Sequence, residues 1–160
     1  MRTPASIAGH PIHPMVVPVA IGGFLLSFVF DIVCLATGTM EPWSVVAYYT
    51  MIGGIVGALI AAVFGFTDLI SLPKGPTRNV GLTHMGINLT IVVLYIINAW
   101  LRHGNPESLK GPMILSLIAI VLLVISGWLG GKMVYEAGVA VTGVGEPTTT
   151  ATRPGRHVEA

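Results

Sequence analysis

Charged residues are scarce in this chain of 160 residues. Asp, Glu, Lys and Arg make up 9% of it, whereas a soluble domain carries about 25%. Hydrophobic residues make up 53%, and the mean hydropathy is +0.82. So few charges cannot cover the surface of a soluble protein, and the lipid bilayer is therefore the expected solvent. The net charge of +1 and the absence of a basic run argue against nucleic acid as a partner.

Cysteine and catalytic motifs are also nearly missing. The single Cys34 excludes an internal disulfide and any Cys-x-x-Cys metal or redox site. No phosphate-binding loop, nucleophile–base arrangement or pair of catalytic carboxylates can be identified. No catalytic residue can be identified from the sequence, so whether the protein is an enzyme stays open. A non-catalytic redox or structural membrane subunit fits the sequence better.

Four long apolar runs are what the sequence does contain. They predict helices at residues 14–37, 43–70, 81–102 and 112–132, each long enough to cross a bilayer. The predicted fold is an all-α, four-helix transmembrane bundle that forms a single domain over residues 14–141. Residues 1–13 are expected to form an extended N-terminal collar. Residues 142–160, where Thr, Pro, Gly and Arg replace the apolar residues, are expected to form a disordered tail.

Lys and Arg are distributed unequally between the two ends of the predicted helices. Two of them, Arg102 and Lys110, fall on the side opposite the termini. The six on the side of the termini are Arg2, Lys74, Arg78, Lys132, Arg153 and Arg156. Loops rich in Lys and Arg stay in the cytoplasm, so the sequence predicts a multi-pass protein with both termini cytoplasmic.

Two His-Pro pairs, at residues 10–11 and 13–14, precede the first apolar run. Proline disfavours the α conformation for the residue before it, so His10 and His13 are both expected to be extended. In a polyproline-like segment residues three apart lie on the same side, with Cα atoms about 9 Å apart. The segment therefore predicts two imidazoles that face the same way at the cytoplasmic edge of the membrane.

Polar residues recur along one face of the third predicted helix. They are His84, Asn88, Tyr95, Asn98 and Arg102, with Ile91 filling the gap. Polar side chains within a span turn toward the interior of a bundle or a water-filled cavity. Two interpretations stay open for Asn88 and Asn98: hydrogen bonds between helices, or part of a ligand site.

Small residues recur every four positions along the second predicted helix, at Gly53, Gly57, Ala61 and Gly65. Such a ridge allows another helix to approach closely. The alternative is a flat cofactor, such as a porphyrin, lying against the glycine face around Gly57. The sequence leaves open whether a packing partner belongs to the same chain or to a second copy.

Two carboxylates lie within the apolar runs. Asp31 is expected either to relay protons or to be hydrogen-bonded to Asn98, Tyr95 or Trp43, because an ionisable group in a span is costly to bury. Asp68 lies near the cytoplasmic end of the second helix, where an ion pair with Arg78 or a role as an oxygen ligand is expected.

His13 and His84 are predicted to lie at similar depth, and they define the candidate site. A b-type haem needs two imidazoles from different segments and small residues that admit the ring. His13 or His10, together with His84, Gly57 and Asn88, provide such a set. A metal ion bound by His10, His13 and His84, with Asp68 as an oxygen ligand, is a second interpretation. The third is that these histidines only anchor the protein at the membrane surface.

Four segments together resemble a known bacterial membrane family. They read GHPIHP (residues 9–14), FGFTDLISLP (64–73), THMGIN (83–88) and SGWLGGKMVYEAGVAV (126–141). The chain is similar, from residue 9 to residue 141, to the domain-of-unknown-function family 2231. The resemblance implies four transmembrane helices in the bacterial cytoplasmic membrane. Some relatives resemble fusions to Rieske iron–sulfur or c-type cytochrome domains, which implies redox partners, but the family supplies no activity.

These observations lead to one preferred function and two alternatives. The preferred hypothesis is an electron-transfer subunit that binds a b-type haem near the cytoplasmic face and passes electrons to a partner protein or to quinone. The first alternative is an ion or small-solute permease lined by Asp31 and the polar face of the third helix. The second is a structural or assembly subunit without a cofactor. A homo-oligomer is compatible with all three.

Overall fold

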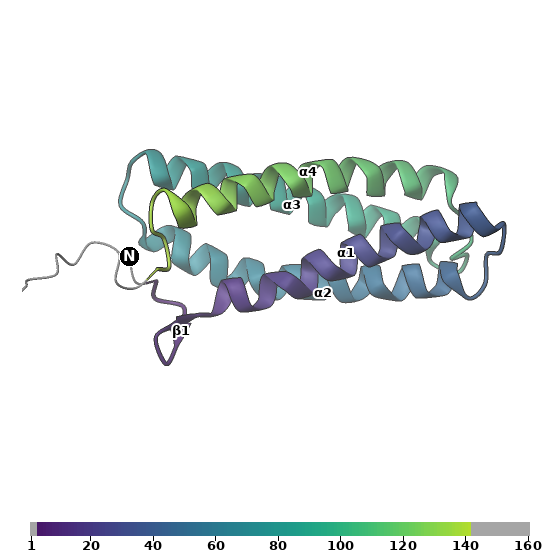
Figure 1. Cartoon of the computed structure of the whole chain (residues 1–160), viewed down its shortest axis with the longest axis horizontal. Coiled ribbons are helices and arrows are strands. Elements are labelled where there is room, and N and C mark those ends of the chain that lie inside the picture. The colour runs from purple at the N-terminus through teal and green to yellow at the C-terminus, as the bar shows by residue number, and fades with distance from the viewer. Residues whose placement is uncertain (1–2, 142–160) are drawn as a thin grey trace, which may run out of the picture.

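A computed structural model describes residues 3–141, and the tail predicted at 142–160 lies outside the described residues. A short hairpin of β1 (Ser6–Ile7) and β2 (His10–Pro11) precedes four helices (Figure 1). The helices are α1 (Ile12–Thr37), α2 (Trp43–Ser71), α3 (Pro76–Arg102) and α4 (Lys110–Tyr135). The predicted all-α, four-helix bundle is therefore confirmed.

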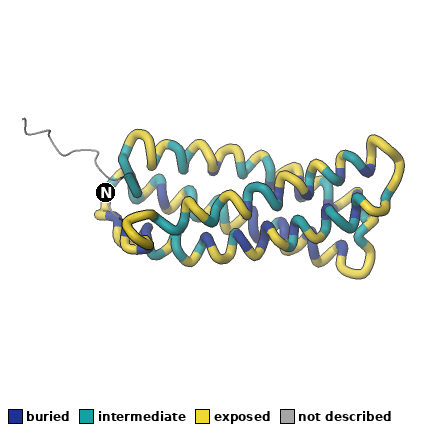
Figure 2. Tube along the Cα trace, turned by 60° about the horizontal axis from the view of Figure 1, so that its bottom comes forward, coloured by how far each residue is buried: buried dark blue, intermediate teal, exposed yellow. Residues whose placement is uncertain are grey.

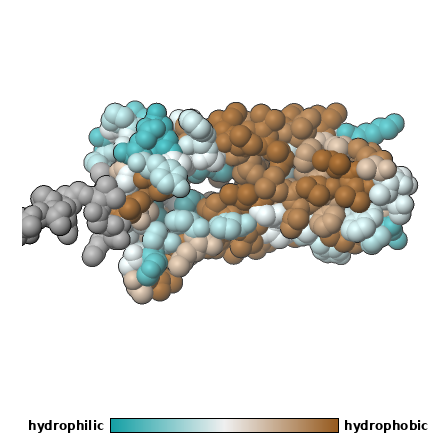
Figure 3. Space-filling model, viewed as in Figure 1, coloured by the Kyte–Doolittle hydropathy of each residue, from teal (hydrophilic) through white to brown (hydrophobic). Residues whose placement is uncertain are grey.

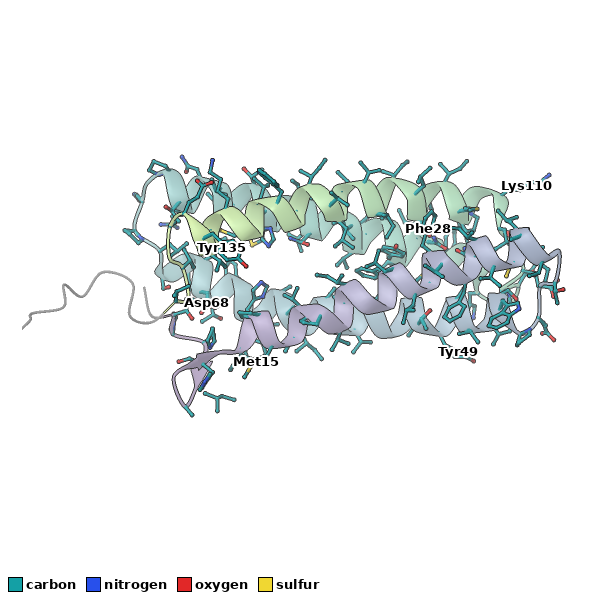
Figure 4. All side chains as sticks on the ribbon, in the orientation of Figure 1. Met15, Phe28, Tyr49, Asp68, Lys110 and Tyr135 are labelled. Atoms are coloured by element: carbon teal, nitrogen blue, oxygen red, sulfur yellow. The ribbon has the colours of Figure 1, made fainter. Side chains whose placement is uncertain are left out.

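The bundle consists of two helical hairpins, α1–α2 and α3–α4. Helices within each hairpin contact each other more closely than helices of different hairpins, and the two hairpins separate toward one end of the bundle (Figure 1). We call that end, where α1 and α3 begin, the histidine end, and the opposite end the arginine end. Asp68 and Tyr135 lie at the histidine end and Lys110 at the arginine end (Figure 4).

All four helices are long and apolar enough to cross a membrane. Much of the outward surface of the helices is exposed (Figure 2). This outward surface is largely apolar along the middle of the bundle and more polar at its two ends (Figure 3). Among the exposed side chains, Val124 and Trp128 of α4 are 70% and 79% accessible. An apolar band of this kind, bounded by polar ends, is what a lipid bilayer requires.

The middle of the bundle is packed with apolar side chains from all four helices. The rings of Phe24 (α1) and Tyr95 (α3) stack in parallel, with centroids 4.0 Å apart and planes 2° from parallel. Around them lie Ala20, Met51, Ile55, Ile91, Ala99 and Ala119. This core joins the two hairpins midway along their length.

Three helices begin earlier than the sequence predicts. α1 begins at Ile12 rather than at residue 14, α3 at Pro76 rather than at residue 81, and α4 at Lys110 rather than at residue 112. The first N–H groups of a helix have no partner within it, so Pro14 and Pro76 in a first turn remove no hydrogen bond. The prediction of an extended His13 is therefore wrong, because that residue is helical.

The N-terminal segment forms a tight turn instead of a polyproline-like collar. Ala8 and Gly9 have positive φ angles of 51° and 81°, and they reverse the chain between β1 and β2. The Ala5 N–H donates to Asp68 Oδ1 over 3.1 Å, which ties this segment to the end of α2. His10 stays exposed on the turn, with Nδ1 3.1 Å from the carbonyl oxygen of Ala8. His10 and His13 therefore do not act as a pair.

Candidate functional site

The imidazole of His13 lies against α2 near the histidine end. Its Nδ1 is 2.8 Å from the carbonyl oxygen of Ala61. The ring lies over Gly65, where an added Cβ would come within 2.9 Å of His13 Cε1 and Nδ1. Gly65 is one turn beyond Ala61, so the carbonyl that binds the ring and the glycine that makes room for it lie on one face of α2.

The imidazole of His84 lies against α4 in the same manner. Its Nδ1 is 2.9 Å from the carbonyl oxygen of Ser126 and 3.0 Å from the Ser126 hydroxyl. A Cβ added at Gly130 would come within 3.3 Å of His84 Cε1. Gly130 again follows the carbonyl-bearing residue by one helical turn. Each hairpin thus provides one histidine, one backbone carbonyl and one glycine.

These hydrogen bonds determine which ring nitrogen can bind a ligand. A carbonyl oxygen only accepts, so the bonded Nδ1 of each ring must carry the proton. In the neutral imidazole Nε2 then keeps a free lone pair. Nε2 of neither His13 nor His84 has a hydrogen-bond partner within residues 3–141, and both residues are half-buried. Both rings are therefore held in the tautomer that ligates a metal through Nε2.

His13 and His84 come from different hairpins, at the end where the hairpins separate. Each imidazole is bonded to the second helix of its own hairpin, His13 to α2 and His84 to α4. The space-filling view shows a hollow between the hairpins toward this end (Figure 3). The sequence-based pairing of His13 with His84 is therefore consistent with their placement at one end of the bundle.

Asn88 connects the two helices that hold His84. Its Nδ2 donates to the Ser126 hydroxyl over 2.6 Å and to the His84 carbonyl oxygen over 2.8 Å. Ser126 is buried, and its hydroxyl is also a partner of His84 Nδ1. Asn88 therefore acts as a hydrogen bond between helices that positions Ser126, which is one of the two interpretations that the sequence left open.

His10 and Asp68 lie apart from this pair. His10 bonds within its own turn, and Asp68 accepts from Ala5 instead of pairing with Arg78. The expected ion pair between Asp68 and Arg78 is therefore wrong for the structure. Within residues 3–141, no group of three or more His, Cys, Asp or Glu side chains is arranged to hold a metal ion.

Gly57 lies in the contact between α1 and α2. A Cβ there would come within 2.9 Å of Val19 Cγ1 and 3.1 Å of the Ala20 nitrogen. The small-residue ridge of α2 therefore packs against α1 of the same chain at Gly57, but Gly53, which was predicted to belong to the ridge, faces outward with open space beside it. The glycines beside the histidines are Gly65, which belongs to the predicted ridge, and Gly130, which was not predicted.

A second polar cluster lies at the arginine end. Arg102 donates from Nη1 and Nη2 to the two oxygens of Asp31, over 2.7 Å and 2.6 Å, and both side chains are fully buried. Asp31 was predicted to bond Asn98, Tyr95 or Trp43, and Arg102 was predicted to be a loop charge, so this pair was not predicted and the partners expected for Asp31 are wrong. The signal was available: Asp31 and Arg102 are opposite charges near the same end of two parallel helices.

Buried polar atoms without partners surround this ion pair. Asn98 Nδ2 donates to the Pro112 carbonyl oxygen over 2.7 Å and to the Ser116 hydroxyl over 2.8 Å. Its Oδ1 has no hydrogen-bond partner in the described part of the chain, and the same holds for Ser27 Oγ, Ser44 Oγ and Arg102 Nε. Asn98 therefore holds α3 to α4, while Asp31 and Arg102 hold α1 to α3.

The architecture defines a polytopic α-helical membrane protein. The model of a family described as predicted membrane protein (DUF2231) matches residues 9–143, which is most of the chain. The chain belongs to this family, and the resemblance seen in its four motifs is confirmed. No curated protein and no solved structure is similar enough to the chain to give a match.

Proposed function

We propose that the protein is an electron-transfer subunit of the membrane that binds a b-type haem between His13 and His84. The observation that carries the proposal is that both imidazole rings are hydrogen-bonded in the same way. Each donates from Nδ1 to a helix carbonyl and keeps Nε2 free. A fixed Nδ1–H orients an imidazole and raises its basicity as a metal ligand. A bound haem would supply a one-electron iron couple.

The donor set fits a haem better than an isolated metal ion. A structural or catalytic metal ion needs three or four protein ligands, and residues 3–141 present no cluster of that size. A haem brings four nitrogens of its own and needs two further ligands, which His13 and His84 would provide from different hairpins. Gly65 and Gly130 make room for the two imidazole rings, and the hollow between the hairpins lies toward the same end of the bundle (Figure 3).

The packing of the bundle gives the permease alternative less support. A continuous polar path would have to pass the middle of the bundle, where Phe24 and Tyr95 stack and Ile91 and Ala119 are buried. Asp31, which would line such a path, holds Arg102 with both carboxylate oxygens. Polar groups near the two ends are thus separated by an apolar core, which suits a protein that moves electrons rather than solutes.

The electron partner is proposed to be a membrane quinone or a redox protein that docks at the histidine end. A haem between His13 and His84 would lie near one membrane surface, because α1 and α3 begin there. The short N-terminal hairpin lies at the same end, anchored to Asp68. Electron exchange with either partner would therefore take place near that surface.

Absorption spectroscopy tests the haem proposal directly. The full chain is expressed with a supply of haem and purified in detergent. The reduced protein should show the sharp bands of a low-spin haem with two axial imidazoles. His13→Ala and His84→Ala should each abolish these bands, because either change leaves the iron with a single protein ligand.

Two matched variants control for general damage. His10→Ala should keep the spectrum, because His10 is exposed on the N-terminal turn. His103→Ala should also keep it, because His103 ends α3 at the arginine end. A colourless parent protein that elutes as a single species and contains no iron by elemental analysis would overturn the proposal.

A further inference from the structure

Contacts between the two hairpins join residues that are separated by a constant interval. Tyr95 donates to the Phe24 carbonyl oxygen, and these two residues are 71 positions apart. Arg102 and Asp31 are also 71 positions apart. His13 and His84 have the same separation. The stacked rings and the ion pair therefore connect equivalent positions of α1 and α3, and the two histidines occupy equivalent positions of the same helices.

Burial follows the same register. The buried residues Ala20, Phe24, Ser27 and Asp31 of α1 correspond to the buried residues Ile91, Tyr95, Asn98 and Arg102 of α3. Ser27 Oγ and Asn98 Oδ1, two of the buried oxygens that have no hydrogen-bond partner within residues 3–141, also form one of these equivalent pairs.

The second helices of the two hairpins repeat as well, at an interval of 65 residues. The four buried residues of α4 are Pro112, Ser116, Ala119 and Ser126, and each follows a buried residue of α2 by that interval: Ala47, Met51, Gly54 and Ala61. At the same interval Ile55, Val56, Ile60 and Gly65 recur as Ile120, Val121, Ile125 and Gly130. The carbonyls and glycines that hold the two histidines are therefore equivalent too.

We infer that the protein is a tandem repeat of one helical hairpin, with a local two-fold axis between α1 and α3, and that His13 and His84 bind one ligand from equivalent positions on either side of that axis. α1 and α3 run in the same direction, so the axis lies along the bundle, as in membrane proteins built from parallel repeats. A residue that contacts its own equivalent must lie at the axis. The stacked rings and the ion pair meet this condition.

The inference about the ligand rests on the proposed function, and the two-fold symmetry narrows the class of ligand that can bind. A ligand that lies on the axis would face one imidazole Nε2 on each of its two opposite sides. A planar metal macrocycle with two open axial positions matches this arrangement, and a haem is the common biological example. A quinone, or a metal ion held by a single cluster of side chains, would not need two equivalent ligands from separate hairpins.

Ligand exchange tests the equivalence of the two histidines. His13→Met and His84→Met should each give a His/Met-ligated haem, with the same shift of the absorption bands and with haem retention that agrees within roughly twofold, since both positions are equivalent. If both variants change the spectrum but differ in band position, or differ in haem retention by more than roughly twofold, the equivalence fails while the haem proposal stands. If the parent binds no haem, the proposed function fails instead.

A charge exchange tests the two-fold repeat without any haem. Asp31→Arg and Arg102→Asp should each reduce the yield of folded, monodisperse protein at least roughly tenfold, because each leaves two like charges buried together. The double exchange should restore the yield to within about twofold of the parent, because equivalent positions accept each other's side chain. Lys132→Glu, in the exposed pair with Glu136, should change the yield less than twofold. A double exchange as poor as the single variants would overturn the repeat.

Discussion

In the ion pair of Asp31 and Arg102, each buried charge is stabilised by the other instead of by water. Each charge alone would be costly at this position, since a charged residue within a span costs at least about 2.5 kcal/mol. Two short, parallel hydrogen bonds compensate for much of that cost. The pair therefore specifies which helices meet at the arginine end more than it adds net stability.

We expect single replacements in this pair to lower the free energy of unfolding much more than the double replacement does. Asp31→Leu or Arg102→Met alone should lower the free energy of unfolding by about 3–5 kcal/mol, because the remaining charge stays buried without its partner. The double variant should lie within about 1 kcal/mol of the parent or above it, because apolar side chains need no partner. Thermal unfolding in detergent measures both effects. A double variant as unstable as the singles would show that the pair itself contributes net stability.

At the scale of the helix, α2 shows that the position of a glycine matters more than its number. Gly54 and Gly57 are buried against α1, whereas Gly53 faces outward with open space beside it. The contact is close enough that a Cβ on Gly23 of α1 would come within 2.6 Å of the Gly54 Cα. This contact brings the two backbones together, and it sets how α1 and α2 are positioned at the histidine end.

Gly57→Leu and Gly53→Leu form a matched pair on α2. Gly57→Leu should lower the free energy of unfolding by about 2 kcal/mol or more, because its side chain would force α1 and α2 apart. Gly53→Leu should be neutral or stabilising by up to about 1 kcal/mol, because leucine favours helix and the site is open. Leu94→Ile should also be mild. Equal stability of the two glycine variants would show that α1 and α2 do not pack at Gly57.

At the scale of the whole molecule, the placement of charge gives the expected orientation. Arg102 belongs to the side opposite the termini in the sequence-based count, but it is buried in its pair with Asp31. Lys110 then remains as the counted charge at the arginine end, while Lys74, Arg78 and Lys132 lie at the histidine end. The asymmetry on which the orientation depends is therefore stronger than the sequence suggested.

Reporter fusions measure this orientation. A reporter placed after Ala160 that is active only in the cytoplasm should be active, and one that is active only in the periplasm should be silent. A second fusion in the loop between α3 and α4, after Asn105, should give the opposite pattern. Activity of the periplasmic reporter at Ala160 would place the histidine end outside the cytoplasm and exclude a cytoplasmic electron partner.

The sequence alone determined the class of protein and which side of α3 faces the interior of the bundle. Apolar runs of fixed length specify four spanning helices, and helical periodicity turns His84, Asn88, Asn98 and Arg102 inward together. These properties are local, because they depend on the spacing of residues within a single helix. The small-residue ridge of α2 was visible for the same reason.

The tertiary structure decided which residues meet. The partners predicted for Asp31 were wrong, His10 and His13 do not act as the predicted pair, and the proposed repeat was not predicted from the sequence. Partner choice depends on the rotation and axial shift of one helix against another, which close contacts such as Gly23 against Gly54 fix only after the chain has folded. The proposed repeat is hard to detect in the sequence because its two halves share few identical residues: a position at the axis needs a complementary partner, such as Arg102 for Asp31, rather than the same residue.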